Sequence, residues 1–206
     1  TFGTSSVAGD YFTTGAQTYN AASYSLVGTD PDFNASSENI QFLDGASGIT
    51  LATGSDLTVD TNSGEDGNIT IAGAITSTAG QTTTVTLEAG SGTVNIAAIG
   101  AGTPGIGNVT IDGSGGITLN GNITTNAGNI DINDATLLAT GDITLTTGGG
   151  TVDFKETTGT IDSAAGETNS LIINSGAGDV ALNAVIGNSR AIDALTINAT
   201  SASHTG

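Results

Sequence analysis

A short pattern of glycine, polar, aliphatic, polar and aliphatic residues recurs along the chain and constrains the fold more than any other feature. Because side chains alternate between the two faces of a strand, both aliphatic residues of a copy share one face and the middle polar residue points away. Each copy is therefore predicted to be a short strand with one buried face. Clear copies occupy residues 67–71, 92–96, 107–111, 128–132, 141–145, 150–154 and 178–182, and degenerate copies occupy residues 55–59, 115–119, 121–125 and 159–163.

The same pattern argues against helices and leaves two all-β architectures. Thr, Val, Ile, Asn and Gly are weak helix formers, and no apolar stripe of 3.6-residue period is visible. An antiparallel sandwich and a parallel β-helix both consist of short strands separated by turns. Near-identical copies favour the parallel β-helix, because each strand can stack on an equivalent strand one coil away. Tight hairpin signals and large aromatic residues, which a sandwich core would use, are scarce.

We expect residues 1–206 to form a single β-solenoid segment, with a change of core composition near residue 45. Residues 46–206 are predicted to form regular coils with aliphatic cores. Residues 1–45 are predicted to form end coils with bulkier buried residues, since aromatic side chains prefer buried positions. A second interpretation is that the aromatic residues cap one end or form a contact between modules. The aromatic residues are Phe2, Tyr11, Phe12, Tyr19, Tyr24, Phe33 and Phe42, with Phe154 later in the chain.

The charge of the chain limits its partners. It has 20 acidic residues against 2 Lys and Arg, which gives a formal net charge of -18 at pH 7. Nucleic acids and anionic membrane surfaces are polyanions, so we expect neither as a partner. Divalent cations or a high-salt medium are more compatible with this charge. No apolar run approaches the roughly 18 residues of a membrane helix, and the absence of cysteine removes disulfide and thiolate chemistry.

Two phrases carry a resemblance to a known class of proteins. Residues 12–21, FTTGAQTYNA, and residues 178–187, GDVALNAVIG, followed by ALTINA at residues 194–199, are similar to recurring units of large repetitive bacterial surface proteins. These proteins are the filamentous-haemagglutinin-like and autotransporter-like β-solenoids. The resemblance implies secretion, a right-handed parallel β-helix and an adhesive or fibre-forming role at the cell surface. It identifies no ligand, although host or environmental glycans are candidate partners.

The resemblance also suggests how copies are arranged. In that family the second unit is commonly followed by a segment like residues 1–3 and then by the first unit, so residues 196–206 would lead naturally into residues 1–20. We therefore hypothesise that the chain is one period of a tandem array or one subunit of a head-to-tail stack. An unclosed solenoid exposes backbone groups and core at each end, and an adjacent repeat or a second copy would cover them.

Candidate catalytic groups are few, and we predict no enzyme and no catalytic residue. Serine-type catalysis requires a base, and His204, the single histidine, is expected to be a solvated tail residue. Some carbohydrate-active enzymes are β-helices with paired carboxylates, so a carbohydrate-binding or carbohydrate-cleaving β-helix is the alternative. The residues that could line such a groove are Asp131, Asn133 and Asp134, or Asp153 with Lys155 and Glu156. Outward acidic residues on a solenoid are more often a solvated face.

Two binding functions remain to be tested. Residues 60–66, DTNSGED, place oxygen ligands loosely as in a calcium loop but lack the twelve-residue pattern. We predict no specific metal ligand or cofactor, with calcium left open. An ice-binding face would require a regular array of outward threonines, whereas the outward position here varies among Thr, Asn, Asp and Ala. The threonines that raise the idea are Thr82, Thr83, Thr84, Thr86, Thr144, Thr146 and Thr147.

Overall fold

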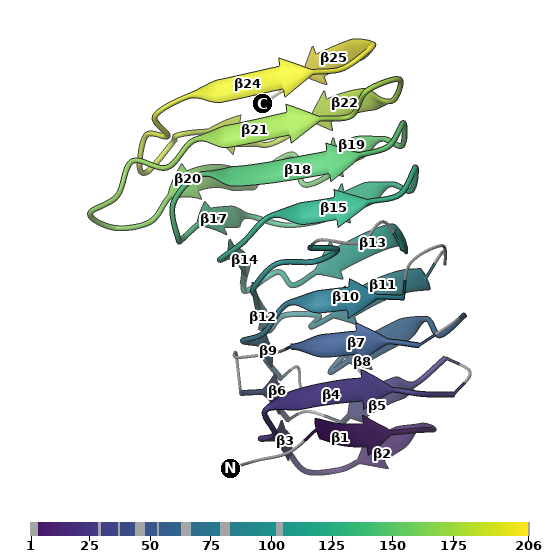
Figure 1. Ribbon diagram of the computed structural model, residues 1–206. Helices are drawn as coiled ribbons and strands as arrows, with labels where there is room; N and C mark the ends of the chain where they lie inside the picture. Colours follow the sequence, from purple (N-terminus) through teal and green to yellow (C-terminus); the bar gives the residue numbers. More distant parts are fainter. Residues whose placement is uncertain are drawn as a thin grey trace.

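The computed structural model describes residues 4–28, 30–36, 38–43, 48–52, 54–62, 67–78, 83–101 and 105–205. Its described part contains strands and turns and no helix, and every strand pairing in it is parallel. Successive strands belong in turn to three sheets that form the sides of a coil, so the chain is a parallel β-solenoid (Figure 1). In Figure 1 the strands at the front run from left to right and the chain rises as it passes behind them, which makes the coil right-handed.

The three sheets, here named A, B and C, form the sides of the solenoid. Sheet A consists of two four-stranded segments. Isolated β-bridges from Ile75 to Ile99 and from Ile99 to Ile123 connect the two segments. Its strands are β1 (Thr4–Val7), β4 (Ser23–Leu26), β7 (Ile49–Leu51), β10 (Ile75–Ser77), β15 (Ile123–Thr125), β18 (Ile143–Thr147), β21 (Leu171–Asn174) and β24 (Leu195–Asn198).

Sheets B and C follow sheet A in every coil. The strands of sheet B are β2 (Tyr11–Thr13), β5 (Asp32–Ala35), β8 (Leu57–Asp60), β11 (Thr83–Glu88), β13 (Ile106–Asp112), β16 (Ile130–Ile132), β19 (Val152–Phe154), β22 (Asp179–Leu182) and β25 (Ser201–His204). The strands of sheet C are β3 (Gln17–Tyr19), β6 (Ile40–Phe42), β9 (Ile69–Ile71), β12 (Thr93–Ile96), β14 (Gly116–Leu119), β17 (Thr136–Leu138), β20 (Thr160–Ser163) and β23 (Val185–Ile186).

The core is a set of aliphatic columns that run along the axis, as the recurring sequence pattern predicts. In sheet B, for example, Val109, Ile130, Val152 and Val180 lie in register on consecutive strands, and each is at most 1% exposed. Full burial of one large aliphatic side chain contributes about 1.5–3 kcal/mol. Because every column repeats this burial once per coil, the stability of the solenoid is spread along its whole length.

The aromatic residues near the N-terminus fill the core of the first coils. Phe33 and Phe42 are almost fully buried, and the rings of Tyr11 and Tyr19 stack on them with centroids 5.2 and 4.6 Å apart. The ladders continue past residue 45, since Phe42 lies in register with Ile71, so the predicted boundary marks a change in core composition within one set of sheets. Phe12 departs from the burial expectation: it points outward and is 65% exposed. Phe2 lies outside the described residues.

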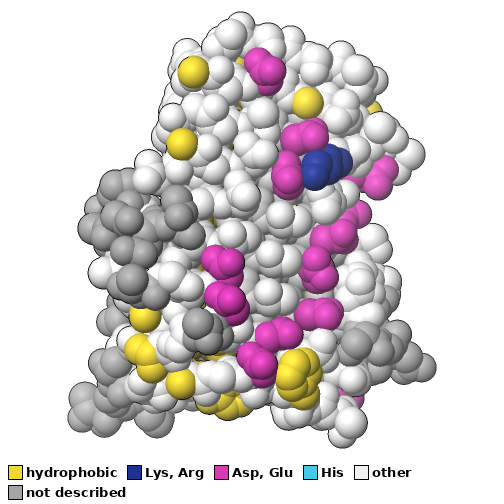
Figure 2. Space-filling view, turned by 90° about the vertical axis from the view of Figure 1, so that its right-hand side faces the viewer, with side chains coloured by type: hydrophobic (Ala, Val, Ile, Leu, Met, Phe, Trp, Pro, Cys, Tyr) yellow, Lys and Arg dark blue, Asp and Glu magenta, His cyan; other side chains and the backbone are white. Residues whose placement is uncertain are grey.

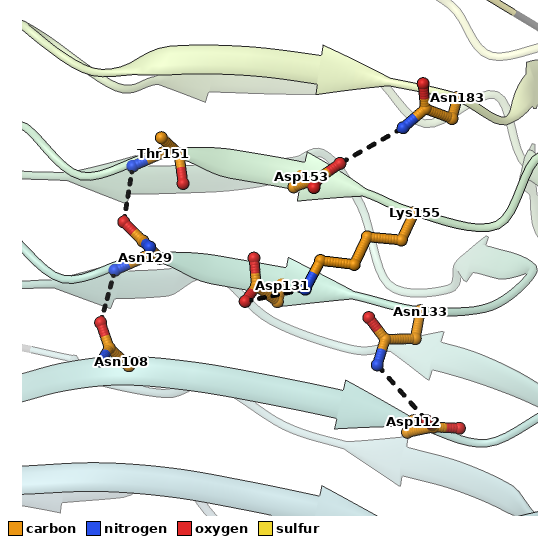
Figure 3. Close-up of polar contacts among 9 residues, drawn as sticks. All are labelled: Asn108, Asp112, Asn129, Asp131, Asn133, Thr151, Asp153, Lys155 and Asn183. Carbon is orange, nitrogen blue, oxygen red and sulfur yellow. Dashed lines mark hydrogen bonds and ion pairs between the residues drawn. The ribbon is translucent and has the colours of Figure 1, made fainter.

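The glycine and Asn of the recurring pattern have separate roles at the corners between strands. A Cβ atom added to Gly150 would lie 2.2 Å from the carbonyl oxygen of Gly128 in the preceding coil, so only glycine permits this approach. The neighbouring side chains connect the coils. Asn108 accepts a hydrogen bond from the backbone N–H of Asn129, and Asn129 accepts one from that of Thr151, both at 2.9 Å (Figure 3).

Candidate functional site

The outer face of sheet B carries a row of carboxylates at the ends of its strands. Asp60, Glu88 and Asp112 follow the last buried aliphatic of β8, β11 and β13 and lie in direct register. Strands in a sheet are about 4.8 Å apart, so these carboxylates are close neighbours. Figure 2 shows Asp and Glu side chains gathered in rows along the axis on this side of the molecule. We call Asp60, Glu88 and Asp112 the acidic row.

Two amides border the acidic row. Asn34 donates a hydrogen bond to Asp60 over 3.0 Å, and Asn133 donates one to Asp112 over 3.3 Å (Figure 3). The carboxylate oxygens of the row thus meet neutral donors at each end, while Glu88 lies between two like charges. The row therefore concentrates negative charge on one side of the solenoid.

A second pair of carboxylates lies further along sheet B, where Asp131 and Asp153 are in register. The ammonium group of Lys155 lies 3.1 Å from Asp131, which is the one ion pair found within the described ranges. Asn183 donates a hydrogen bond to Asp153 over 3.4 Å, and both contacts are visible in Figure 3. Lys155 therefore offsets part of the charge of this pair, in contrast to the acidic row.

Burial and neighbouring charges shift the pKa values of several carboxyl groups on this face. Burial, followed by the charges of nearby carboxylates, raises the pKa of Asp32 and of Glu88 above the ordinary values of Asp and Glu. Burial also raises the pKa of Asp153, although Lys155 opposes this shift. Hydrogen bonds from Thr158 act the other way on Glu156 and lower its pKa. Ionisation of Asp32, Glu88 and Asp153 is thus less favourable than in freely solvated side chains.

The structure separates most of the groove residues suggested by the sequence. Asp131 is bound by Lys155, Asp134 accepts the backbone N–H of Gly113 over 3.0 Å, and Glu156 accepts the N–H and hydroxyl of Thr158. Each of these carboxylates is thus hydrogen-bonded or ion-paired at the surface. None of the three lines either of two surface hollows, one on sheet B and one on sheet C.

One of these hollows brings two carboxylates together. Asp153 and Asp179, with the hydroxyl-bearing Ser201 and Ser203, line a depression of about 300 Å³ on sheet B above the small side chain of Ala181. Asp179 accepts a hydrogen bond from the Ser201 hydroxyl over 2.5 Å. The other hollow, about 230 Å³, lies on sheet C beside Gly116. Of the predicted groove residues, Asp153 is the one that a hollow includes.

The remaining candidate residues occupy positions that their sequence context did not reveal. His204 was expected in a solvated tail, but it is the last residue of β25, paired in register with Leu182, and its side chain is exposed. In the calcium-like segment, Asp60 accepts the backbone N–H of Asn62 over 2.6 Å, and residues 63–66 lie outside the described residues. Within the described ranges no group of three or more His, Cys, Asp or Glu residues is arranged to hold a metal ion.

The threonines do not share one face. Thr86 points outward from sheet B, whereas Thr144 and Thr146 belong to sheet A. Thr83 and Thr147 are buried, and their hydroxyl groups donate to the carbonyl oxygens of Gly105 and Gly150. Thr82 lies outside the described residues. The described members of this candidate set therefore form no single ordered array of the kind that ice binding requires.

The C-terminal end of the solenoid leaves core positions uncovered. Leu195 lies in register with Leu171 of the preceding coil, yet Leu195 is 39% exposed and Leu171 is 0% exposed. Ile197 is likewise only partly buried, above fully buried Ile173. Both side chains occupy inward positions of β24 that a further coil would cover. We call the surface formed by β23, β24 and β25 the open end.

Sequence reasoning missed one buried carboxylate and the alignment of the acidic row. Asp162 alternates with buried residues and was expected to be outward and solvated, but it is buried because the loop after β23 covers it; its carboxylate accepts the N–H groups of Ser189 and Arg190. No sequence signal identifies this loop contact. The acidic row did have a signal, since each of its members follows the second aliphatic of a strand in the phrases LTVD, VTLE and VTID.

These observations define the class of the chain as an acidic repeat protein with a right-handed parallel β-solenoid fold. Comparison with protein-family models, with curated proteins and with solved structures finds no match to it. Within the described part of the chain, no helix is long and apolar enough to cross a membrane.

Proposed function

We propose that this chain is a structural and adhesive module of a bacterial extracellular fibre, of the filamentous-haemagglutinin-like or autotransporter-like type, and that further coils extend it end to end. The open end carries this proposal. Leu195 and Ile197 continue buried columns of the core but are themselves uncovered. An adjacent repeat or a second copy would bury them by continuing the same sheets.

The energetics favour such an extension. Full burial of an exposed large aliphatic side chain contributes about 1.5–3 kcal/mol, and covering Leu195 and Ile197, which are already partly buried, would contribute a part of this for each. A new strand also pairs the edge backbone groups of β23, β24 and β25. The contact joins one end to a different end, so it leaves a new open end after each addition. Contacts of this type propagate as a filament unless something caps them.

The outer surface is compatible with the proposed adhesive role. That surface consists mainly of Thr, Asn, Asp and Ser side chains, so contacts with a host or environmental glycan would be weak and would repeat along the fibre. The charge of the acidic face would keep neighbouring fibres apart and make their association depend on salt. This role requires no catalytic residue, no cofactor and no nucleic-acid partner.

The experiment measures filament formation by the purified chain with electron microscopy and sedimentation velocity. About 0.15 M salt, where the Debye length is about 8 Å, limits repulsion between the acidic copies. We expect filaments for the unaltered chain and their loss in Leu195→Asp, which places a charge at the joint. Thr196→Asp is the matched control, because Thr196 points outward on the same strand. A chain that stays monomeric at high concentration, or equal behaviour of the two variants, would refute end-to-end assembly.

The hollow beside Asp153 and Asp179 favours a second candidate function, carbohydrate binding. Two carboxylates and two serine hydroxyls can accept and donate hydrogen bonds to sugar hydroxyls, and the depression is large enough for one sugar residue. Binding of a glycan library that Asp179→Asn reduces and Asp112→Asn leaves unchanged would support this function. Equal binding by both variants would count against this site.

A further inference from the structure

At the open end the three sheets stop at different heights along the axis, an arrangement that we call a staircase. Along the chain, β23 in sheet C is followed by β24 in sheet A and β25 in sheet B. Sheets A and B therefore end one strand beyond sheet C, as the top of Figure 1 shows for β24 and β25. Because strands follow the order A, B, C as the coil rises along its axis, a further strand would lie in sheet C, directly on β23.

The N-terminal end of the described chain is a matching staircase that starts in a different sheet. Its lowest strand is β1 in sheet A, followed by β2 in sheet B and β3 in sheet C. A second copy placed directly above the first, with like sheets over like sheets, would set β1 on β24 and β2 on β25. Its β3 would then lie two levels above β23, and one strand of sheet C would be missing from the joint.

That missing strand makes the unrotated joint unfavourable. The backbone N–H and C=O groups of β23 would face a gap one strand deep, and unpaired buried backbone groups are costly. The side chain of Ile186 would also remain uncovered, although it continues the column of fully buried Ile161. The gap would recur at every joint of a fibre.

We propose that successive copies are turned by about one third of a turn about the fibre axis, so that β1 stacks on β23, β2 on β24 and β3 on β25. This inference rests on the proposed end-to-end assembly and specifies its geometry. The two staircases then fit step for step, and every strand of the open end gains a parallel partner. Of the three ways to superpose the sides of the solenoid, it is the one that leaves no missing strand.

The lengths of the connections in the chain favour the same arrangement for copies joined directly in tandem. Five residues would separate His204 of one copy from Thr4 of the next. Five residues also separate β19 from β20, a connection from sheet B to sheet C. A connection from sheet B past sheet C to the next strand of sheet A is longer, and the nine residues between β2 and β4 are the shortest instance among the printed strand bounds. A direct joint therefore leads from sheet B to the sheet C position.

The rotation has a consequence for the surface of the fibre. The acidic row lies on sheet B of each copy, and sheet B of the next copy lies over sheet A of the previous one. The acidic face then winds around the fibre in steps instead of running straight along one side. At about 4.8 Å per strand level, one copy adds roughly 42 Å, and the original orientation returns after roughly 125 Å.

The test uses two full copies joined directly, each carrying one cysteine. The chain has no cysteine of its own, so any disulfide reports on the introduced pair. Paired strands bring Cα atoms within the distance that a disulfide needs, whereas positions on different sides of the solenoid are too far apart. In the first pair, Thr196→Cys in the first copy and Phe12→Cys in the second place outward cysteines on β24 and β2. In the matched pair, Thr196→Cys is combined with Ser6→Cys, on β24 and β1.

We expect most tandem chains to cross-link in the Thr196 and Phe12 pair and only a trace in the Thr196 and Ser6 pair. Val185→Cys in the first copy with Ser6→Cys in the second, on β23 and β1, should cross-link as well. Cross-linking of the Thr196 and Ser6 pair, or of none of the pairs, would overturn the rotation. Filament formation by the single chain tests assembly separately, so a tandem protein that cross-links as expected without spontaneous filaments would refute only self-assembly.

Discussion

Adding one methyl group at Gly150 tests the close contact between successive coils. Its new Cβ atom would lie 2.2 Å from the carbonyl oxygen of Gly128, 2.5 Å from the carbonyl carbon and 3.0 Å from the carbonyl oxygen of Ala127. These neighbours are backbone atoms, which cannot rotate away as a flexible side chain can. Overpacking of a tight site typically costs 1–3 kcal/mol, and we expect Gly150→Ala to cost about 3 kcal/mol. For a chain of this length that loss lowers Tm by roughly 6–12 °C.

Gly15→Ala is the matched control, because no atom lies within 4 Å of its added Cβ and its backbone is outside the left-handed region. The alanine there should leave stability unchanged or raise it by about 0.4–1 kcal/mol through the unfolded chain. Thermal unfolding followed by circular dichroism measures both variants. If Gly150→Ala unfolds at the same temperature as the unaltered chain, the coils are further apart at this corner than described and the reasoning from glycine fails.

The remaining predictions concern the core and the acidic row. Ile132→Asp places a charge in a fully buried column between Ile111 and Phe154. We expect the free energy of unfolding to fall by more than about 3 kcal/mol and hydrogen exchange to become faster in the adjoining coils. Unchanged thermal unfolding would contradict the columnar core. Because the folded pKa values of Asp32 and Glu88 are raised, the folded state holds protons more tightly than the unfolded chain, and stability should rise as pH falls from 7 through those raised pKa values towards the ordinary carboxyl range. Glu88→Gln should raise stability at pH 7 by a few tenths to about 1 kcal/mol and weaken this pH dependence, whereas a lower Tm at pH 7 would show that the row is not repulsive.

Charge repulsion on one side would matter for the proposed fibre. A neutral solenoid with open sheet ends and apolar cores would associate in many ways, whereas strong negative charge along the side disfavours lateral contacts. The open end holds uncovered Leu195 and Ile197 instead of a carboxylate row. In the proposed fibre, attraction would thereby act along the axis and repulsion would act from the acidic side, an arrangement that favours single fibres over lateral bundles.

The sequence determined the main features of the architecture because the relevant interactions are local and repeated. Alternation within each copy, as in Ile130, Asp131 and Ile132, specifies which side chains are buried, and the similarity of the copies specifies that like strands stack. Glycine also precedes many of the strands, as Gly128 and Gly150 do before β16 and β19, and it marks the corners there. A single coil therefore contains most of the information needed for the fold, and the prediction of a right-handed parallel β-helix is confirmed.

Only the tertiary structure decided which residues meet across coils. Asp60, Glu88 and Asp112 are 28 and 24 residues apart in sequence, and the unequal corner loops between them determine whether they align. Asp162 is buried by a loop that has no recurring pattern. The height difference between β23 and β25 depends on how the strands of the described residues are divided among the three sheets. The local periodicity of the sequence determines the structure of one coil. The register between coils and the shape of each end depend on the lengths of all the coils, and the variable loops change those lengths.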